Sequence, residues 1–137
     1  MPSLTRDEAV ARAALLTVEE MEVDLDLTLG AETFGSRTTI RFGCAEAGSA
    51  TFADLKAVSL GSARLNGEAL PAEAWDGERL ALTGLLAVNV LEVEATMAYS
   101  RDGQGLHRTV DPADERPYVY GHLFLDAAPK VFACFDQ

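Results

Sequence analysis

Apolar and polar side chains alternate one by one along residues 21–29 and 91–99, and this pattern constrains the fold most strongly. In the first stretch Met21, Val23 and Leu25 alternate with Glu22 and Asp24. Because successive side chains of a β-strand point to opposite faces of its sheet, each stretch predicts a half-buried antiparallel strand with one wet face. Residues 33–42 repeat the pattern.

Pairing and turn signals agree with this prediction. Arg37 and Arg41 occupy the polar side of residues 33–42, so we expect them to face the acids of the preceding strand and help to fix its register. Asn66-Gly67 and Asp76-Gly77 accept the positive φ angles of tight hairpin turns. Two hairpins are therefore expected.

The N-terminal segment predicts one helix over residues 5–17. Thr5 and Glu8 form a capping-box pattern, and Val10, Ala13 and Ala14 give a weak apolar stripe that could lie on a sheet. One helix followed by about seven strands favours a mainly all-β fold, either an antiparallel β-sandwich or a saddle-shaped sheet. We expect residues 1–137 to form a single domain.

Two further segments carry expectations. The polar residues 100–117 predict a long loop, and loops of that length are often functional or buttressed by a neighbour. The chain closes on the apolar run VFACFDQ, residues 131–137, where a domain end usually turns polar. This run suggests a polypeptide that continues further.

Charge and composition exclude several classes of partner. The 22 acidic residues against 11 basic ones repel phosphate, which argues against nucleic acid and anionic membranes. Cys44 and Cys134 are too few for a disulfide framework and are expected to be buried thiols. The sequence has neither a signal peptide nor an apolar run near the roughly 20 residues of a membrane span, so a cytoplasmic location is expected.

Catalytic and metal-binding patterns are missing from the sequence. There is no H-E-x-x-H, and neither His107 nor His122 has a carboxylate at metal-ligand spacing. No G-x-S-x-G elbow presents a nucleophile. We therefore expect no catalytic residue and no metal site in this chain, and its composition leaves the function open.

Two long segments resemble a known family. Residues 105–137, GLHRTVDPADERPYVYGHLFLDAAPKVFACFDQ, and the opening residues 4–42 resemble the N-terminal domain of M1-family zinc aminopeptidases, the aminopeptidase N group, most closely its actinobacterial form. The resemblance covers nearly the whole chain, with a looser match in the middle.

This resemblance implies a truncated, noncatalytic N-terminal β domain that walls the substrate cleft. Its partner would be the catalytic domain of the same polypeptide. The parent enzyme would remove N-terminal residues from peptides with a zinc-bound water, so zinc is implied for the parent and not for this chain. The alternative is a stand-alone, noncatalytic β-sandwich binding module derived from the same architecture.

The resemblance also gives two candidate substrate-binding residues. The family's Y-L-Y-T-Q-F-E segment reads YVYGHLF here, so His122 replaces the Gln and Phe124 replaces the Glu that binds the substrate's α-amine. Amine recognition is then either lost or altered, or Asp126 takes over that role. Ordinary strand residues beside the core are the third interpretation of His122 and Phe124.

An incomplete sheet would leave an unpaired edge, which we expect near residues 131–135. Exposed apolar edges recruit other strands. We therefore expect the isolated chain to associate with itself through that edge.

Overall fold

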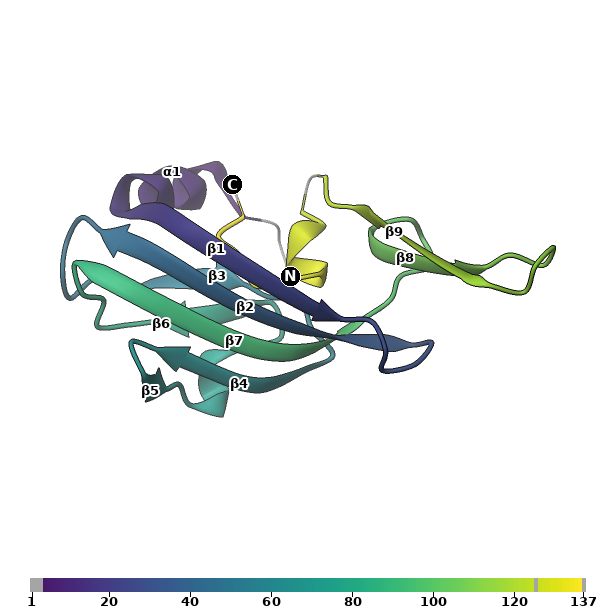
Figure 1. The fold of residues 1–137 in the computed structure, drawn as a ribbon. Helices are drawn as coiled ribbons and strands as arrows, with labels where there is room; N and C mark the ends of the chain where they lie inside the picture. Colours follow the sequence, from purple (N-terminus) through teal and green to yellow (C-terminus); the bar gives the residue numbers. More distant parts are fainter. Residues whose placement is uncertain (1–3, 125, 137) are drawn as a thin grey trace.

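A curved, five-stranded antiparallel sheet forms the main layer of the molecule (Figure 1). The computed structural model describes residues 4–124 and 126–136. The strands lie in the order β1-β2-β7-β4-β5. Their bounds are Leu16–Asp26 for β1, Thr33–Cys44 for β2, Ser59–Leu65 for β4, Glu68–Ala69 for β5 and Val88–Ala98 for β7. The three longest strands therefore coincide with the three alternating segments of the sequence.

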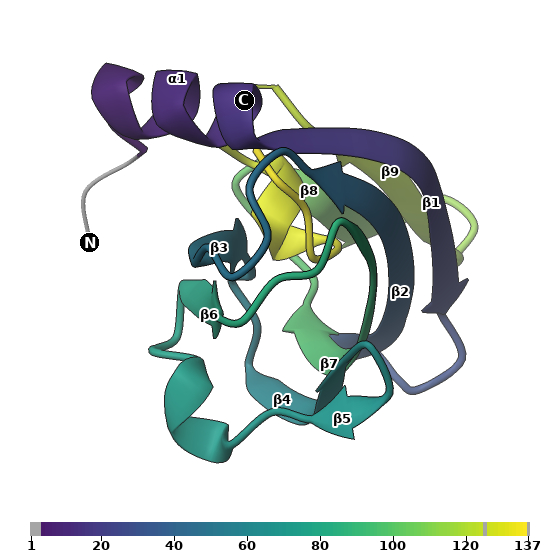
Figure 2. The same cartoon turned by 90° about the vertical axis from the view of Figure 1, so that its left-hand side faces the viewer.

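A smaller second layer lies in the hollow of this sheet (Figure 2). It consists of the antiparallel pair β3 (Thr51–Asp54) and β6 (Arg79–Leu82), with the 3-10 helices η1 (Ala72–Ala74) and η2 (Ala128–Lys130). Between the layers, side chains from both are fully buried, among them Phe34, Phe42, Leu55, Leu80 and Leu91. The mainly all-β, antiparallel fold with one short helix is confirmed.

Both predicted turns are present. Asn66 and Gly67 have φ angles of 54° and 84° and join β4 to β5. Gly77 has a φ of 105° between Trp75 and Leu80, which form a bridge across the second turn. Asn and Gly tolerate these angles because their side chains cause little steric conflict there.

The helix α1 spans Arg6–Leu15, and its capping box between Thr5 and Glu8 is formed as predicted. The apolar stripe, however, does not attach it to the sheet. Val10 is 61% exposed, whereas Arg12 is buried at 3% exposure. The prediction is wrong here because the helix docks through a charged side chain whose partners lie far away in the sequence.

The arginine rows of β2 follow the prediction in part. Arg41 contacts Glu20 of β1 at 3.4 Å. Arg37 instead donates from its Nε to Glu94 of β7 at 2.6 Å, although Asp24 of β1 lies opposite it in the register. Each arginine has an acidic strand on either side, so either neighbour can supply its partner.

Residues 100–117 do not form the predicted loop. They contain strand β8 (Gly105–Val110), which pairs with β9 (Pro117–His122) to form a two-stranded ribbon. Figure 1 shows this ribbon projecting away from the main sheet. The sequence signal is weak because β9 is exposed along its whole length and β8 is fully buried at Gly105 alone, so no buried side imposes an apolar row.

The prediction of a free strand edge at residues 131–135 is also wrong. Val131 and Ala133 are each 1% exposed, and Cys134 forms an antiparallel bridge with Asp54 of β3. One edge of the sheet lies at β1, and its expected buried face is exposed at Met21 and Val23, which are 37% and 40% exposed, whereas Leu25 on the same face packs against the core.

Cys44 and Cys134 are free and buried, as predicted. Among the described residues, no helix is long and apolar enough to cross a membrane.

Candidate functional site: the β8–β9 ribbon

The base of the ribbon is fixed to the body by backbone contacts. Ser100, just after β7, donates its N–H to the carbonyl of Leu106 at 2.8 Å and accepts from the N–H of Arg108 at 3.2 Å. Gly105 is buried with a φ of +69°, and a Cβ at this position would lie 3.3 Å from the Cβ of Lys130. The ribbon therefore leaves the body at a closely packed point with a defined direction.

One face of the ribbon carries a row of aromatic rings. The register pairs His107 with Tyr120 and places Tyr118 and His122 on the same side, because alternate residues of β9 share a face. The rings of His107 and Tyr120 stack with centroids 4.9 Å apart. The backbone N–H of Gly103 donates to Nδ1 of His107 at 3.0 Å. This contact fixes the imidazole orientation under the tyrosine.

The tip of the ribbon is closed by carboxylates. The Tyr118 hydroxyl donates to Asp114, which raises the pKa of Tyr118 and lowers that of Asp114. Asp111 and Asp114 accept backbone N–H groups from Ala113 and Arg116 at 2.8 and 2.9 Å. The acids of the tip thus serve its own turn, while the rings of Tyr118 and Tyr120, 47% and 53% exposed, face solvent.

The two candidate residues from the sequence lie at the other end of β9. His122 pairs with Gly105 at the base, and Phe124 follows the strand. Their rings meet edge to face with centroids 5.1 Å apart, and Phe124 is 75% exposed. Both side chains therefore extend the aromatic row instead of packing in the core. Asp126, the alternative carboxylate, forms an ion pair with Lys56 at 3.7 Å.

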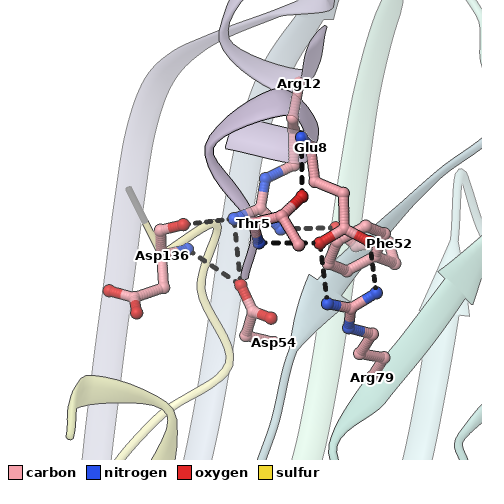
Figure 3. Close-up of polar contacts among 7 residues, drawn as sticks. All are labelled: Thr5, Glu8, Arg12, Phe52, Asp54, Arg79 and Asp136. Carbon is pink, nitrogen blue, oxygen red and sulfur yellow. Dashed lines mark hydrogen bonds and ion pairs between the residues drawn. The ribbon is translucent and has the colours of Figure 1, made fainter. Parts of the chain in front are cut away.

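A buried charge cluster holds the segment that follows the ribbon, and the sequence analysis missed it (Figure 3). Arg12 of α1 donates from Nη1 to the carbonyl of Phe52 at 3.0 Å and from Nη2 to the carbonyl of Asp136. Its Nη2 also lies 3.0 Å from the carboxylate of Asp54, which accepts the N–H of Asp136 at 3.1 Å. One guanidinium thereby ties together the helix, β3 and the last described residues.

A second arginine lies beside this cluster. Arg79 of β6 makes a two-pronged contact with Glu8, both N–O distances being 3.0 Å, and its guanidinium lies 4.2 Å from the ring centre of Phe52. The hydrogen bonds from Arg79, with that from the Thr5 backbone, lower the pKa of Glu8 to about 2. No spacing rule could find these contacts, because Arg12 and Phe52 are 40 residues apart and Arg12 and Asp136 are 124 apart.

The ionisable groups of this cluster stabilise the structure and offer no reactive group. Burial, reinforced by the charges of Asp136 and Asp54, raises the pKa of the Cys134 thiol to about 12, so the reactive thiolate is disfavoured. Burial also raises the pKa of Asp136, and the nearby Asp54 adds to this effect. Within residues 4–124 and 126–136, no group of three or more His, Cys, Asp or Glu side chains could hold a metal ion.

Comparison with known proteins finds one similar protein by sequence and none by family model. No family model matches the chain. The chain is 48% identical to aminopeptidase N of Streptomyces lividans over an alignment 139 positions long, and the match covers 98% of this chain. This chain is a relative of aminopeptidase N. The resemblance seen in the sequence is confirmed, and the chain spans 16% of the length of that aminopeptidase N.

Solved structures agree on the fold. Leukotriene A4 hydrolase of Saccharomyces cerevisiae matches with a TM-score of 0.71 at 15% identity, over 91% of this chain and 22% of the hydrolase. A variant of the M1 zinc metallopeptidase of Deinococcus radiodurans matches with a TM-score of 0.69 at 16% identity, over 90% of this chain and 29% of that protein. The fold is thus the β-rich architecture found in part of these enzymes.

Proposed function

We propose that this chain is the noncatalytic N-terminal β domain of an M1-like zinc aminopeptidase and forms one wall of the substrate cleft. The observation that carries the proposal is the 48% identity to aminopeptidase N along nearly the whole chain. Peptide hydrolysis would then be performed by the catalytic domain of the same polypeptide.

The ribbon is the part of this wall that would meet the peptide. Its base is packed against η2 and Ser100, and its exposed aromatic row runs from Tyr118 to Phe124. Ligand sites are commonly lined by apolar and aromatic side chains held on a rigid support. A ribbon that is anchored at its base and carries rings on one face supports this assignment.

Recognition of the substrate's α-amine would be lost or altered in this relative. A phenyl ring cannot accept the charge-assisted hydrogen bond that a carboxylate offers to an ammonium group. The other possibility, a substitute carboxylate from Asp126, is supported less well, because that side chain is paired with Lys56. His122 would contribute ring contact beside Phe124, given their edge-to-face packing.

Zinc would act as a Lewis acid and activate a water molecule at the catalytic domain. The described part of this chain offers no metal-binding group of three, so its residues would bind and orient the peptide only. The cytoplasmic location expected from the sequence remains a prediction.

The test is a hydrolysis assay on the complete reading frame that contains this chain. We expect the complete polypeptide to hydrolyse aminoacyl amides, to lose that activity with a zinc chelator and to regain it when zinc is restored. The 137-residue chain alone is expected to be inactive. A complete polypeptide that binds peptides and hydrolyses none, with or without zinc, would refute the enzyme and favour the stand-alone binding module.

A further inference from the structure

The short loop of residues 101–104 lies against Tyr120 of the aromatic row. A Cβ placed on Gly103 would lie 3.9 Å from the Tyr120 hydroxyl, and the Tyr120 ring stacks on His107 with centroids 4.9 Å apart. The backbone N–H of Gly103 donates to Nδ1 of His107 at 3.0 Å. The loop, the imidazole and the tyrosine ring therefore form one connected unit.

The same loop is also fixed to the body. The backbone N–H of Gln104 donates to the carboxylate of Asp102 at 3.0 Å, which holds the turn. The Nζ of Lys130 in η2 donates to the Gln104 side chain at 2.8 Å. His107 is thus the side chain through which a loop bound to η2 contacts the ribbon face that carries the rings.

The hydrogen bond from Gly103 fixes the protonation state of His107. A backbone N–H can only donate, so Nδ1 must accept and the neutral ring carries its proton on Nε2. In the imidazolium form both ring nitrogens carry protons, and two N–H groups would face each other. The contact therefore exists only with the neutral side chain.

We propose that His107 is a positioning residue for the aromatic row: its neutral imidazole holds Tyr120 against the loop, and protonation at mildly acidic pH releases the ribbon from that loop. The consequence for peptide binding rests on the proposed function, in which the row meets the peptide. A fall in pH would then weaken peptide binding through the ribbon.

The elements packed around His107 leave this titration to histidine. Their ionisable groups are Tyr99, Arg101, Asp102, Arg108, Tyr120, His122 and Lys130. Arginine, lysine and tyrosine ordinarily keep their charge state between about pH 5 and 8, the range in which histidine changes its own. The hydrogen bond from the Gln104 backbone, with the charge of Lys130, lowers the pKa of Asp102, which therefore stays ionised. His122 is the other histidine of the chain and needs its own control.

Hydrogen exchange in the complete polypeptide tests the proposal. Exchange of residues 105–110 and 117–122 is measured at about pH 7.5 and about pH 5, on either side of the histidine range, and corrected for the intrinsic rate at each pH. We expect protection of the ribbon to fall about threefold or more at the lower pH, as the loss of one hydrogen bond predicts, while β7 stays protected. Equal protection of the ribbon at both pH values would overturn the proposal.

Two substitutions separate the acceptor of His107 from its ring. His107→Asn keeps an acceptor at the δ position and cannot be protonated, whereas His107→Phe keeps a ring against Tyr120 and has no acceptor. We expect protection of the ribbon to be independent of pH in both variants and higher in the Asn variant. A Phe variant as well protected as the native protein at pH 7.5, or an Asn variant whose protection still falls at pH 5, would overturn the proposal.

His122→Asn is the matched control, because it removes the other histidine of this face and leaves the contact between Gly103 and His107 in place. Protection of its ribbon should fall at pH 5 as in the native protein. Loss of the pH dependence in this variant would assign the titration to His122 and overturn the role of His107.

Kinetics relates the contact to peptide binding. In the complete polypeptide, His107→Phe should raise KM for a peptide substrate about threefold or more and leave kcat nearly unchanged, because the row binds the peptide and takes no part in the chemistry. A fall in kcat at unchanged KM would overturn the positioning role.

The exchange measurements do not depend on catalysis. An inactive polypeptide whose ribbon responds to pH as expected would refute the proposed enzyme and leave the contact of His107 standing. An active polypeptide whose ribbon is insensitive to pH would refute the role of His107 alone.

Discussion

Removal of the buried Arg12 should damage the fold strongly. Its side chain is 3% exposed and faces Asp54, which is 12% exposed. Taking away one member of a buried ion pair leaves the other charge without compensation, which typically costs about 3 kcal/mol or more. We expect Arg12→Met to lower the free energy of unfolding by about that amount in chemical denaturation.

Arg37→Met is the control for this substitution. Arg37 and Glu94 form an ion pair whose side chains are 67% and 48% exposed, and exposed pairs contribute at most about 1 kcal/mol. A loss for Arg12→Met no larger than that for Arg37→Met would contradict the Arg12 clamp, that is, the contacts of Arg12 with Phe52, Asp54 and Asp136. The double variant Arg12→Met, Asp54→Asn is expected to recover part of the loss, because it removes the uncompensated carboxylate.

Glu8 should make stability depend on pH in a defined window. Its pKa falls from 4.5 to about 2 in the folded chain, mainly through the hydrogen bonds from Arg79. The folded state therefore binds its proton less readily than the unfolded state, so the contribution is complete above pH 4.5 and is lost as the pH falls toward 2.

The variant Glu8→Gln checks this sign. Thermal melts of the two proteins are expected to differ most above pH 4.5 and to converge near pH 2. A difference that grows as the pH falls would show that the Glu8–Arg79 contact has been assigned the wrong role.

At the scale of elements, the alternation of apolar and polar side chains predicted well where the strands lie. It predicted poorly whether their apolar faces are buried. Residues 91–99 place Leu91, Val93 and Met97 in the core as expected, because β7 has neighbours on both edges and a layer over one face. β1 has the same alternation, but Met21 and Val23 on its apolar face remain exposed. The pattern reports which side a residue faces, while burial depends on what the rest of the chain places there.

The ribbon and the clamp escaped prediction for a related reason. β9 is exposed along its whole length and β8 is buried at Gly105 alone, so no apolar period marks the pair. The candidates His122 and Phe124 came from the resemblance and not from the period. Arg12 gave no signal because its partners come from segments that are close only after folding.

Gly105 gives a prediction for the ribbon element. The variant Gly105→Ala places a methyl group at a φ of +69° and 3.3 Å from the Cβ of Lys130. Gly84→Ala has a similar φ of +62° with nothing within 4 Å. We expect both to lower the free energy of unfolding by about 1 kcal/mol, with an additional loss for Gly105 from the contact with η2.

Hydrogen exchange of β8 and β9 separates the two effects. Gly105→Ala is expected to speed exchange in the ribbon, whereas Gly84→Ala should leave it unchanged. Equal ribbon exchange in the two variants would mean that the base does not fix the direction of the ribbon.

At the scale of the whole molecule, a two-layer body carries a projecting ribbon (Figure 1). The clamp of Arg12 holds the chain after the ribbon against α1 and β3 (Figure 3). The base of the ribbon packs against the same segment through Gly105 and Lys130. The position of the aromatic row is thus set by the body, as a cleft wall requires.

The most direct measurement is the preference of the complete polypeptide for substrates with a free α-amine. The ratio of kcat/KM for an aminoacyl amide to that for its N-acetyl form is measured for the native protein, Phe124→Glu and Val119→Glu. Val119 lies on the opposite face of the ribbon from Tyr118 and Tyr120 and is the matched control.

If the aromatic row faces the peptide, Phe124→Glu should raise this ratio by about tenfold or more, as a charge-assisted hydrogen bond provides. Val119→Glu should leave the ratio unchanged. A ratio that stays the same in Phe124→Glu, or rises equally in both variants, would contradict a ribbon that lines the substrate cleft.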